Sequence, residues 1–256
     1  MQLFDTHAHL LDDKFDEDRN ALIPSLPAAG VRGFVEACVE AEDIPKIQAL
    51  TLLYDFVYGS AGIHPHSASK ADRSNLLRVE RALEQKKIVA VGEIGLDYHY
   101  DFSPREAQRE AFANQLDLAI AAKKPVIIHD REAHGDVMAL LSARKGRLGG
   151  VLHCYSGSYE DAFRYIDMGY YIAFGGALTF KNATKQRCIA EKLPLDRLVI
   201  ETDCPYMTPE PHRGERNSPL LIHLTLETLA KVRNISLEEA AAATYQNAMD
   251  LFGISL

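Results

Sequence analysis

Leu3-Phe-Asp-Thr-His-Ala8 is a short apolar segment that ends in polar residues, and it is the first of eight such segments along the chain. The eight segments share aliphatic or aromatic residues and nearby turn formers, a pattern typical of buried β-strands. We therefore expect strands over Leu3–Ala8, Val31–Ala37, Phe56–Gly62, Ile88–Ile94, Pro125–Asp130, Gly150–Tyr155, Tyr170–Gly175 and Arg197–Thr202.

Helical patterns separate these segments. Ser103-Pro-Arg-Glu106 reads as a helix start, with Ser103 as the N-cap and Glu106 as its reciprocal acid, and apolar residues follow at helical spacing. Ser158 with Asp161 and Ser236 with Glu239 repeat this capping pattern. The segment from Pro219 to Phe252 predicts one or two closing helices.

Strands that alternate with helices over about 250 residues are typical of a (β/α)8 TIM barrel, which is the α/β fold we expect. The doubly wound open sheet is the main alternative. No linker rich in Gly, Ser or charge divides the 256 residues, so residues 1–256 are predicted to form a single domain.

Composition narrows the class of protein further. Hydrophobic residues make up 47% of the chain and charged residues 25%, which excludes disordered and low-complexity classes. No apolar stretch is long enough for a membrane helix, the first thirty residues are rich in acids, and the four cysteines form no C-x-x-C pair, so we expect a cytoplasmic protein. Nothing in the sequence indicates an obligate protein partner.

The charge balance limits how the protein could bind a polyanion. Thirty-six acidic residues against 28 basic ones leave a net charge of −8. A broad basic surface for nucleic acid is therefore excluded, and a polyanionic substrate would have to be attracted locally.

Residues that can bind metals gather where the predicted strands end. In barrels and open α/β sheets the chemistry lies at the carboxyl ends of the strands. The residues in question are His7, His9, His64, Glu93, His129, His153 and Asp203.

The spacing of two of these histidines is informative. His7 and His9 stand at positions i and i+2 of one strand, so their imidazoles share a face and can converge on one ion. Glu93 lies in an apolar strand, where a carboxylate needs a cation or an ion pair, and Arg131 is the alternative partner. Taken singly, His129 and His153 could equally be hydrogen-bonded core histidines. Cys154 and Cys204 are expected to point to the other side of their strands.

Six motifs together resemble the TatD-type metal-dependent nucleases, a branch of the amidohydrolase-like TIM-barrel hydrolases. They are Asp5–Leu10, Gly62–Pro65, Gly92–Asp97, Ile128–Ala133, His153–Gly157 and Glu201–Pro205, followed by Arg213-Gly214 and Arg216–Pro219. The resemblance implies a phosphodiesterase that acts on DNA with two divalent ions. One ion would be bound by His7, His9, Glu93 and Asp203, and the other by Glu93, His129 and His153. Asp130 departs from the serine that the family often has.

Imidazole and carboxylate ligands suit Zn or Mn, and Mg is also compatible with nuclease chemistry. Two such ions can activate a water for attack on phosphorus without a side-chain nucleophile. We expect Glu93 to bridge the ions and Asp203 to take the proton of the water. Glu201 could assist Asp203 or simply brace a neighbouring strand. Substrate contacts are predicted for His64, Arg131, Arg213 and Arg216, with Lys181 extending the basic patch.

Two other functions fit the same ligand set. A metal-bound water attacks a carbonyl carbon as readily as phosphorus, so an amide or ester hydrolase is the main alternative. A lysine in place of Glu93 would have favoured that reading. A barrel that binds metal without turnover is the third possibility.

Overall fold

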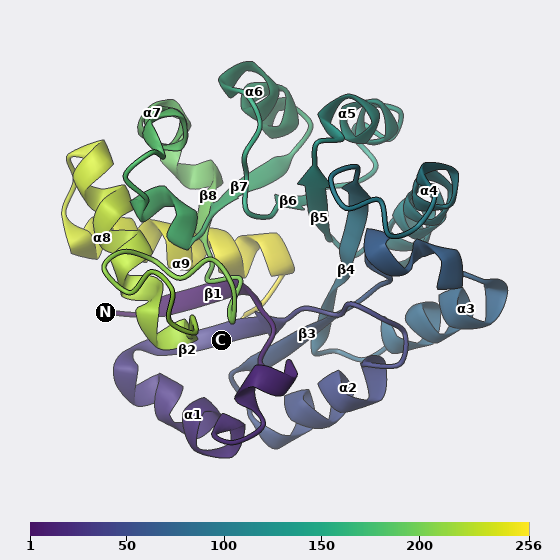
Figure 1. Cartoon of the computed structure of the whole chain (residues 1–256), viewed down its shortest axis with the longest axis horizontal. Coiled ribbons are helices and arrows are strands. Elements are labelled where there is room, and N and C mark those ends of the chain that lie inside the picture. The colour runs from purple at the N-terminus through teal and green to yellow at the C-terminus, as the bar shows by residue number, and fades with distance from the viewer. Residues whose placement is uncertain (256) are drawn as a thin grey trace.

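The computed structural model of the chain describes residues 1–255, and its centre is a ring of eight parallel strands surrounded by helices (Figure 1). Each expected strand is present, with ends that differ by at most three residues. The strands are β1 (Leu3–Ala8), β2 (Val31–Glu36), β3 (Val57–Ala61), β4 (Ile88–Asp97), β5 (Val126–Arg131), β6 (Gly150–Leu152), β7 (Tyr170–Phe174) and β8 (Leu198–Ile200).

The sheet follows the order β1 to β8, and its two edges meet. Beyond the end of β8, Ala8 pairs with Cys204 in a parallel bridge. The amide of Asp203 donates to the carbonyl of His7 at 2.9 Å, and the amide of His9 donates to the carbonyl of Cys204 at 2.8 Å. Because the first and last strands join, the sheet is a barrel and not a doubly wound open sheet, as predicted.

Helices follow the strands around the outside of the barrel (Figure 1). They are α1 (Arg19–Ser25), α2 (Ile44–Leu53), α3 (Arg73–Ala82), α4 (Arg105–Ala122), α5 (His134–Ser142), α6 (Tyr159–Asp167), α7 (Thr184–Lys192) and α8 (Ile222–Arg233), and α8 is followed by a further helix, α9 (Leu237–Phe252). Within residues 1–255 none of them is long and apolar enough to cross a membrane.

Two of the three predicted helix caps are confirmed. The hydroxyl of Ser158 accepts from the amide of Asp161, and that of Ser236 accepts from the amide of Glu239. The cap predicted at Ser103 is wrong, because Pro104 occupies the N-cap position of α4. The hydroxyl of Ser103 instead accepts from the amide of Ser69 and donates to the carbonyl of His66, so it is engaged in tertiary contacts and does not cap the helix.

A second layer of core fills the barrel itself. Phe4, Val89, Ile127, Val151 and Val199 stand near the beginnings of their strands and form one cluster with residues of α9. The rings of Phe4 and Phe252 lie 6.0 Å apart. Helix α9 therefore closes the amino-terminal end of the barrel, and the carboxyl end is left for polar side chains.

Candidate metal centre

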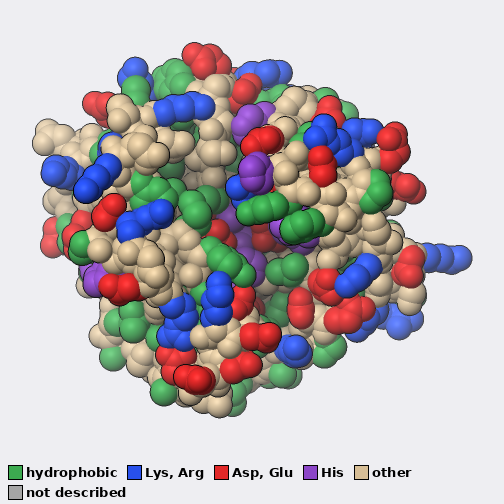
Figure 2. Space-filling view, in the orientation of Figure 1, with side chains coloured by type: hydrophobic (Ala, Val, Ile, Leu, Met, Phe, Trp, Pro, Cys, Tyr) green, Lys and Arg blue, Asp and Glu red, His purple; other side chains and the backbone are tan. Residues whose placement is uncertain are grey.

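Side chains from six different strands or strand ends meet at the carboxyl end of the barrel. Figure 2 shows histidines and carboxylates at the bottom of a hollow in this face. The residues are those predicted as ligands together with His64, namely His7, His9, His64, Glu93, His129, His153 and Asp203. Glu93 lies at the centre of the group.

The first set of donor atoms consists of Nε2 of His7, Nε2 of His9, Oε2 of Glu93 and Oδ1 of Asp203. The two imidazole nitrogens lie 3.0 Å apart. His7 Nε2 lies 3.3 Å from the Glu93 oxygen and 3.8 Å from the Asp203 oxygen. For His9 Nε2 the corresponding distances are 3.7 and 3.6 Å. Four donors from three segments of the chain thus face one another.

The second set surrounds the other oxygen of Glu93. Oε1 lies 2.8 Å from Nδ1 of His129, 3.2 Å from Nε2 of His153 and 3.5 Å from Nε2 of His64. One carboxylate is therefore shared by the two sets. The sequence predicted a substrate contact for His64, whereas the structure places its Nε2 at a distance from Glu93 similar to those of the predicted ligands.

The donor geometry fits divalent ions. Ligands at about 2.1 Å from a tetrahedral ion stand about 3.4 Å apart, and the distances in the first set scatter around that value. His129 gives a second test. Its Nε2 lies 3.1 Å from the Asp97 carboxylate, which can only accept, so in the neutral ring Nδ1 presents a lone pair to Glu93. Two lone pairs 2.8 Å apart need a positive charge between them or a proton.

Electrostatics around Glu93 point in the same direction. Burial alone would raise the pKa of this carboxyl, but His64, His7 and His153 surround it and hold the pKa well below its ordinary value. Glu93 therefore remains an anion although its side chain is only 4% exposed. A buried carboxylate with five imidazoles around it is a strong cation ligand.

The local backbone explains how Glu93 reaches the centre of the barrel. The pairing of β4 with β5 is irregular between Val91 and Ile94, and the amide of Glu93 donates to the carbonyl of Cys38 at 2.9 Å. Gly95 has φ +149°, and a Cβ there would lie 1.9 Å from the carbonyl oxygen of His129. Only glycine permits this approach, so the Gly-Glu-Ile-Gly sequence is needed to shape the strand.

Buried carboxylates behind the ligands fix the ligand side chains. Glu201 lies 3.2 Å from Nδ1 of His153 and also accepts from the amide of Cys154. Asp97 contacts His129 and accepts from His66 at 2.8 Å. These contacts hold two imidazole rings of the second set in place.

Two further buried acids support the first set. Asp5 accepts from the amide and hydroxyl of Thr202 at 2.9 and 2.6 Å, which ties the end of β8 to β1. Glu36 accepts from the amides of Leu10 and Leu11 at 2.9 and 2.8 Å, just after His9. Burial raises the pKa of both acids to about 7.

Sequence reasoning assigned a supporting role only to Glu201. Asp97 ends the Gly92–Asp97 motif, but nothing in the spacing indicates that its side chain contacts His129. His66 could have been found, because His64 and His66 repeat the i, i+2 spacing of His7 and His9. Asp5 and Glu36 give no comparable signal, since their partners are backbone amides that are distant in sequence.

The basic residues predicted to contact the substrate lie at the rim of the hollow, and their contacts differ from one residue to the next. Both terminal nitrogens of Arg216 pair with the Asp18 carboxylate, at 2.8 and 2.6 Å. The Arg213 guanidinium lies 3.7 Å from the Phe180 ring centre, and that of Arg131 lies 4.7 Å from the Tyr100 ring centre. Within residues 1–255 Arg131 forms no ion pair with Glu93, so that alternative for Glu93 was wrong. Lys181 is exposed.

The sequence and the fold of this chain are similar to those of several known proteins. The sequence profile of a family described as TatD related DNase matches residues 4–253. A Bacillus subtilis protein named uncharacterized metal-dependent hydrolase YabD is 40% identical over 254 residues, which cover 99% of this chain and all of that protein.

Two further relatives are informative. A Cronobacter turicensis protein named 3'-5' ssDNA/RNA exonuclease TatD is 33% identical over 257 residues, covering 98% of this chain and 97% of that protein. The crystal structure of YjjV, a TatD homologue from Escherichia coli K12, superposes with a TM-score of 0.92 at 34% identity and covers 99% of this chain and 98% of that one.

Proposed function

Since the chain belongs to the TatD-related family of metal-dependent hydrolases, we propose that it is an exonuclease that hydrolyses phosphodiester bonds of DNA with two divalent ions. The observation that carries the proposal is the sharing of Glu93. Its two oxygens face two separate sets of donor atoms. The name of the Cronobacter relative supports a single strand degraded in the 3'–5' direction.

The proposed centre has a definite division of ligands. His7, His9, Glu93 and Asp203 would hold one ion, and Glu93, His129 and His153 the other, with His64 next to the second. Zn, Mn and Mg are all compatible with the donor set. When bound, such ions lower the pKa of a water and stabilise the charge on the reacting phosphate.

We assign to Asp203 the role of accepting the proton of the attacking water. Its side chain is 16% exposed, against 4% for Glu93, so it is the ligand carboxylate that a water from the hollow can reach. Its pKa is lowered, because hydrogen bonding to His9 and the charges of His153 and His7 outweigh burial. Asp203 is therefore ionised at neutral pH, as a group that accepts a proton has to be.

The residues around the ligands hold the ligand rings in place and can bind the substrate. Asp97 fixes the ring of His129, and Glu201 fixes that of His153, which favours a positioning role for Glu201 over a direct catalytic one. Arg213 and Arg131 are exposed at the rim, where they can bind phosphates beside the reacting one. The reaction then needs no broad basic surface, in keeping with the net charge of −8.

An end-labelled oligonucleotide digest tests the proposal. The metal-loaded protein should produce a ladder that starts at one end, and Glu93→Ala should produce none. Bis-p-nitrophenyl phosphate and a panel of esters and amides are assayed with the same sample. Hydrolysis of an ester or amide without any cleavage of the oligonucleotide would replace the nuclease by the amidohydrolase alternative.

A further inference from the structure

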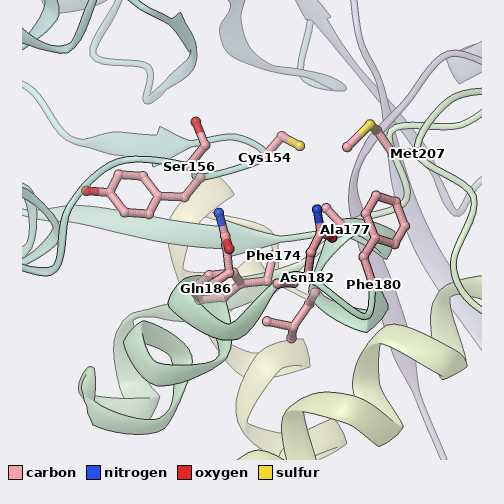
Figure 3. A pocket seen from close by; sticks show the side chains of 12 residues that line it. Cys154, Ser156, Phe174, Ala177, Phe180, Asn182, Gln186 and Met207 are labelled. Carbon is pink, nitrogen blue, oxygen red and sulfur yellow. The ribbon is translucent and has the colours of Figure 1, made fainter.

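A pocket lies beside the proposed metal centre, between the segments that follow β6, β7 and β8. Its volume is about 270 Å³. Figure 3 shows the side chains around it, among them Cys154, Phe180, Asn182, Gln186 and Met207. They come from the loop after His153, from the segment between β7 and α7, from α7 itself, and from the loop after Asp203.

The pocket shares a wall with the metal centre. Cys154 follows His153 directly, and its amide donates to Glu201, the residue that contacts His153. On another side, a Cβ added to Gly175 would lie 3.4 Å from Cγ of Glu201. Tyr206, next to Met207, donates its amide to the carbonyl of Asp203 at 2.9 Å. A group bound here therefore lies next to whatever the centre binds.

The lining is neutral, and this limits the occupant. None of the twelve described residues that line the pocket is acidic or basic. Phosphate and carboxylate groups would be unpaired in such surroundings. A neutral group is expected instead.

The individual side chains suit a flat heterocycle. Phe174 and Phe180 supply aromatic surface, and Cys154 and Met207 supply polarisable sulfur. The amides of Asn182 and Gln186 offer both donors and acceptors toward the pocket (Figure 3). Arg213 lies over the Phe180 ring at 3.7 Å and links this wall to the rim.

We propose that this pocket receives the nucleobase of a nucleotide that flanks the scissile phosphate, an inference that rests on the proposed nuclease function. A volume of about 270 Å³ falls just below the range of about 300–1,000 Å³ for pockets of drug-sized ligands, so it holds one base and not a base pair. The base must be unpaired to enter. Amides that donate and accept fit the edges of all four bases, so we expect little base preference.

Three variants test the pocket. Ala177→Phe fills it, Gln186→Leu removes one amide, and Gln246→Leu makes the same change at an exposed glutamine on α9 as the control. Each is assayed on a normal single strand and on strands with an abasic residue on either side of the scissile phosphate. The wild type should cleave one of the abasic strands about tenfold more slowly, as expected from the loss of one stacked base.

The combination of variant and substrate decides the outcome. Ala177→Phe and Gln186→Leu should be about tenfold slower than wild type on the normal strand and equal to wild type on the affected abasic strand. Gln246→Leu should match wild type on both. If wild type cleaves normal and abasic strands equally, or if the pocket variants lose the same factor on both, the pocket does not receive a base.

A binding measurement separates this inference from the nuclease proposal. Deoxyadenosine has no phosphate, and calorimetry or ligand-observed NMR should detect its binding to wild type and to Gln246→Leu but not to Ala177→Phe. Binding without any cleavage of oligonucleotides would support the pocket and overturn the nuclease. Cleavage without nucleoside binding or an effect of the abasic residue would support the nuclease and overturn the pocket.

Discussion

Nε2 of His129 lies 3.1 Å from Oδ2 of Asp97. The carboxylate thereby fixes which ring nitrogen carries the hydrogen, and Nδ1 is left free to face Glu93 at 2.8 Å. Asp97 itself is 0% exposed, and its amide is held by the side chain of Gln108. Asp97 is not among the proposed ligands, but through this contact it controls the orientation of the His129 ring, which is one of them.

We predict that Asp97→Ala lowers metal affinity at the second set by about 10–100-fold, the range found for residues that orient a ligand. Removal of the carboxylate lets the His129 ring rotate and changes its tautomer. Competition with a coloured chelator measures the affinity. His66→Ala is the matched control, since it removes the other partner of Asp97 and leaves His129 in place. Equal losses for the two variants would contradict the assignment.

Two divalent ions per chain are expected in a fully active sample. Chelation should abolish hydrolysis, and Mn or a similar ion should restore it, because the proposed nucleophile is a water that the ions would activate. Elemental analysis together with activity during stepwise metal addition provides the measurement. A metal-free sample with full activity would end the metal interpretation.

Glu93→Ala should be more damaging than His64→Ala. Glu93 contributes an oxygen to each donor set, whereas His64 Nε2 lies 3.5 Å from one of these oxygens and belongs to one set only. We expect a loss in turnover of more than about a hundredfold for Glu93→Ala and of about tenfold for His64→Ala. Metal content should fall by up to two ions in the first variant. Similar residual rates and metal contents would remove the bridging role of Glu93.

The two arginines after β8 should behave differently. Arg213→Ala should raise KM for an oligonucleotide by about tenfold and leave the hydrolysis of bis-p-nitrophenyl phosphate nearly unchanged, because a small diester has no flanking phosphate. Arg216→Ala should have a smaller effect on KM, since Asp18 already engages both terminal nitrogens of Arg216.

The double variant Arg213→Ala, Arg216→Ala tests whether these effects concern phosphate at all. We expect its KM to be about that of Arg213→Ala alone. A proportional loss on both substrates would mean that the arginines support the structure and do not bind flanking phosphates.

Glu36 should make the stability of the protein depend on pH. Its folded-state pKa is raised from 4.5 to about 7 by burial, so the folded protein binds a proton that the unfolded chain releases between these values. Stability from this group is therefore present at pH 4.5 and is lost as the pH rises toward 7. The full change is about 3 kcal/mol at about 1.4 kcal/mol per pH unit.

Chemical denaturation at pH 5 and pH 7.5 measures this effect. Glu36→Gln should lose stability at both values, because an amide cannot accept from both Leu10 and Leu11, but its stability should fall less between them. Glu42→Gln, at an exposed acid nearby, should keep the slope of the wild type. An unchanged slope in Glu36→Gln would assign the pH dependence to other groups.

Much of the fold follows from local patterns. Eight apolar segments with helical stretches between them predicted all eight strands. The prediction works because a buried strand needs a short run of apolar residues bounded by turn formers. The boundaries were less certain, as at β6, where His153 and Cys154 leave the strand after Leu152. The predicted N-cap at Ser103 was wrong because the hydroxyl of Ser103 accepts a hydrogen bond from the amide of Ser69, and the local sequence does not indicate this distant partner.

The sequence by itself determined which residues were candidate ligands. Histidines and carboxylates at the ends of barrel strands lie near one opening, and the family resemblance then assigned His7, His129 and Asp203 to the proposed ions. Tertiary structure decided everything that depends on pairwise distance. The contact of Asp97 with His129, the ion pair of Arg216 with Asp18 and the pocket beside Cys154 are seen only in the tertiary structure. These contacts join residues far apart in the chain, and no local pattern records them because each depends on how the loops after the strands pack against one another.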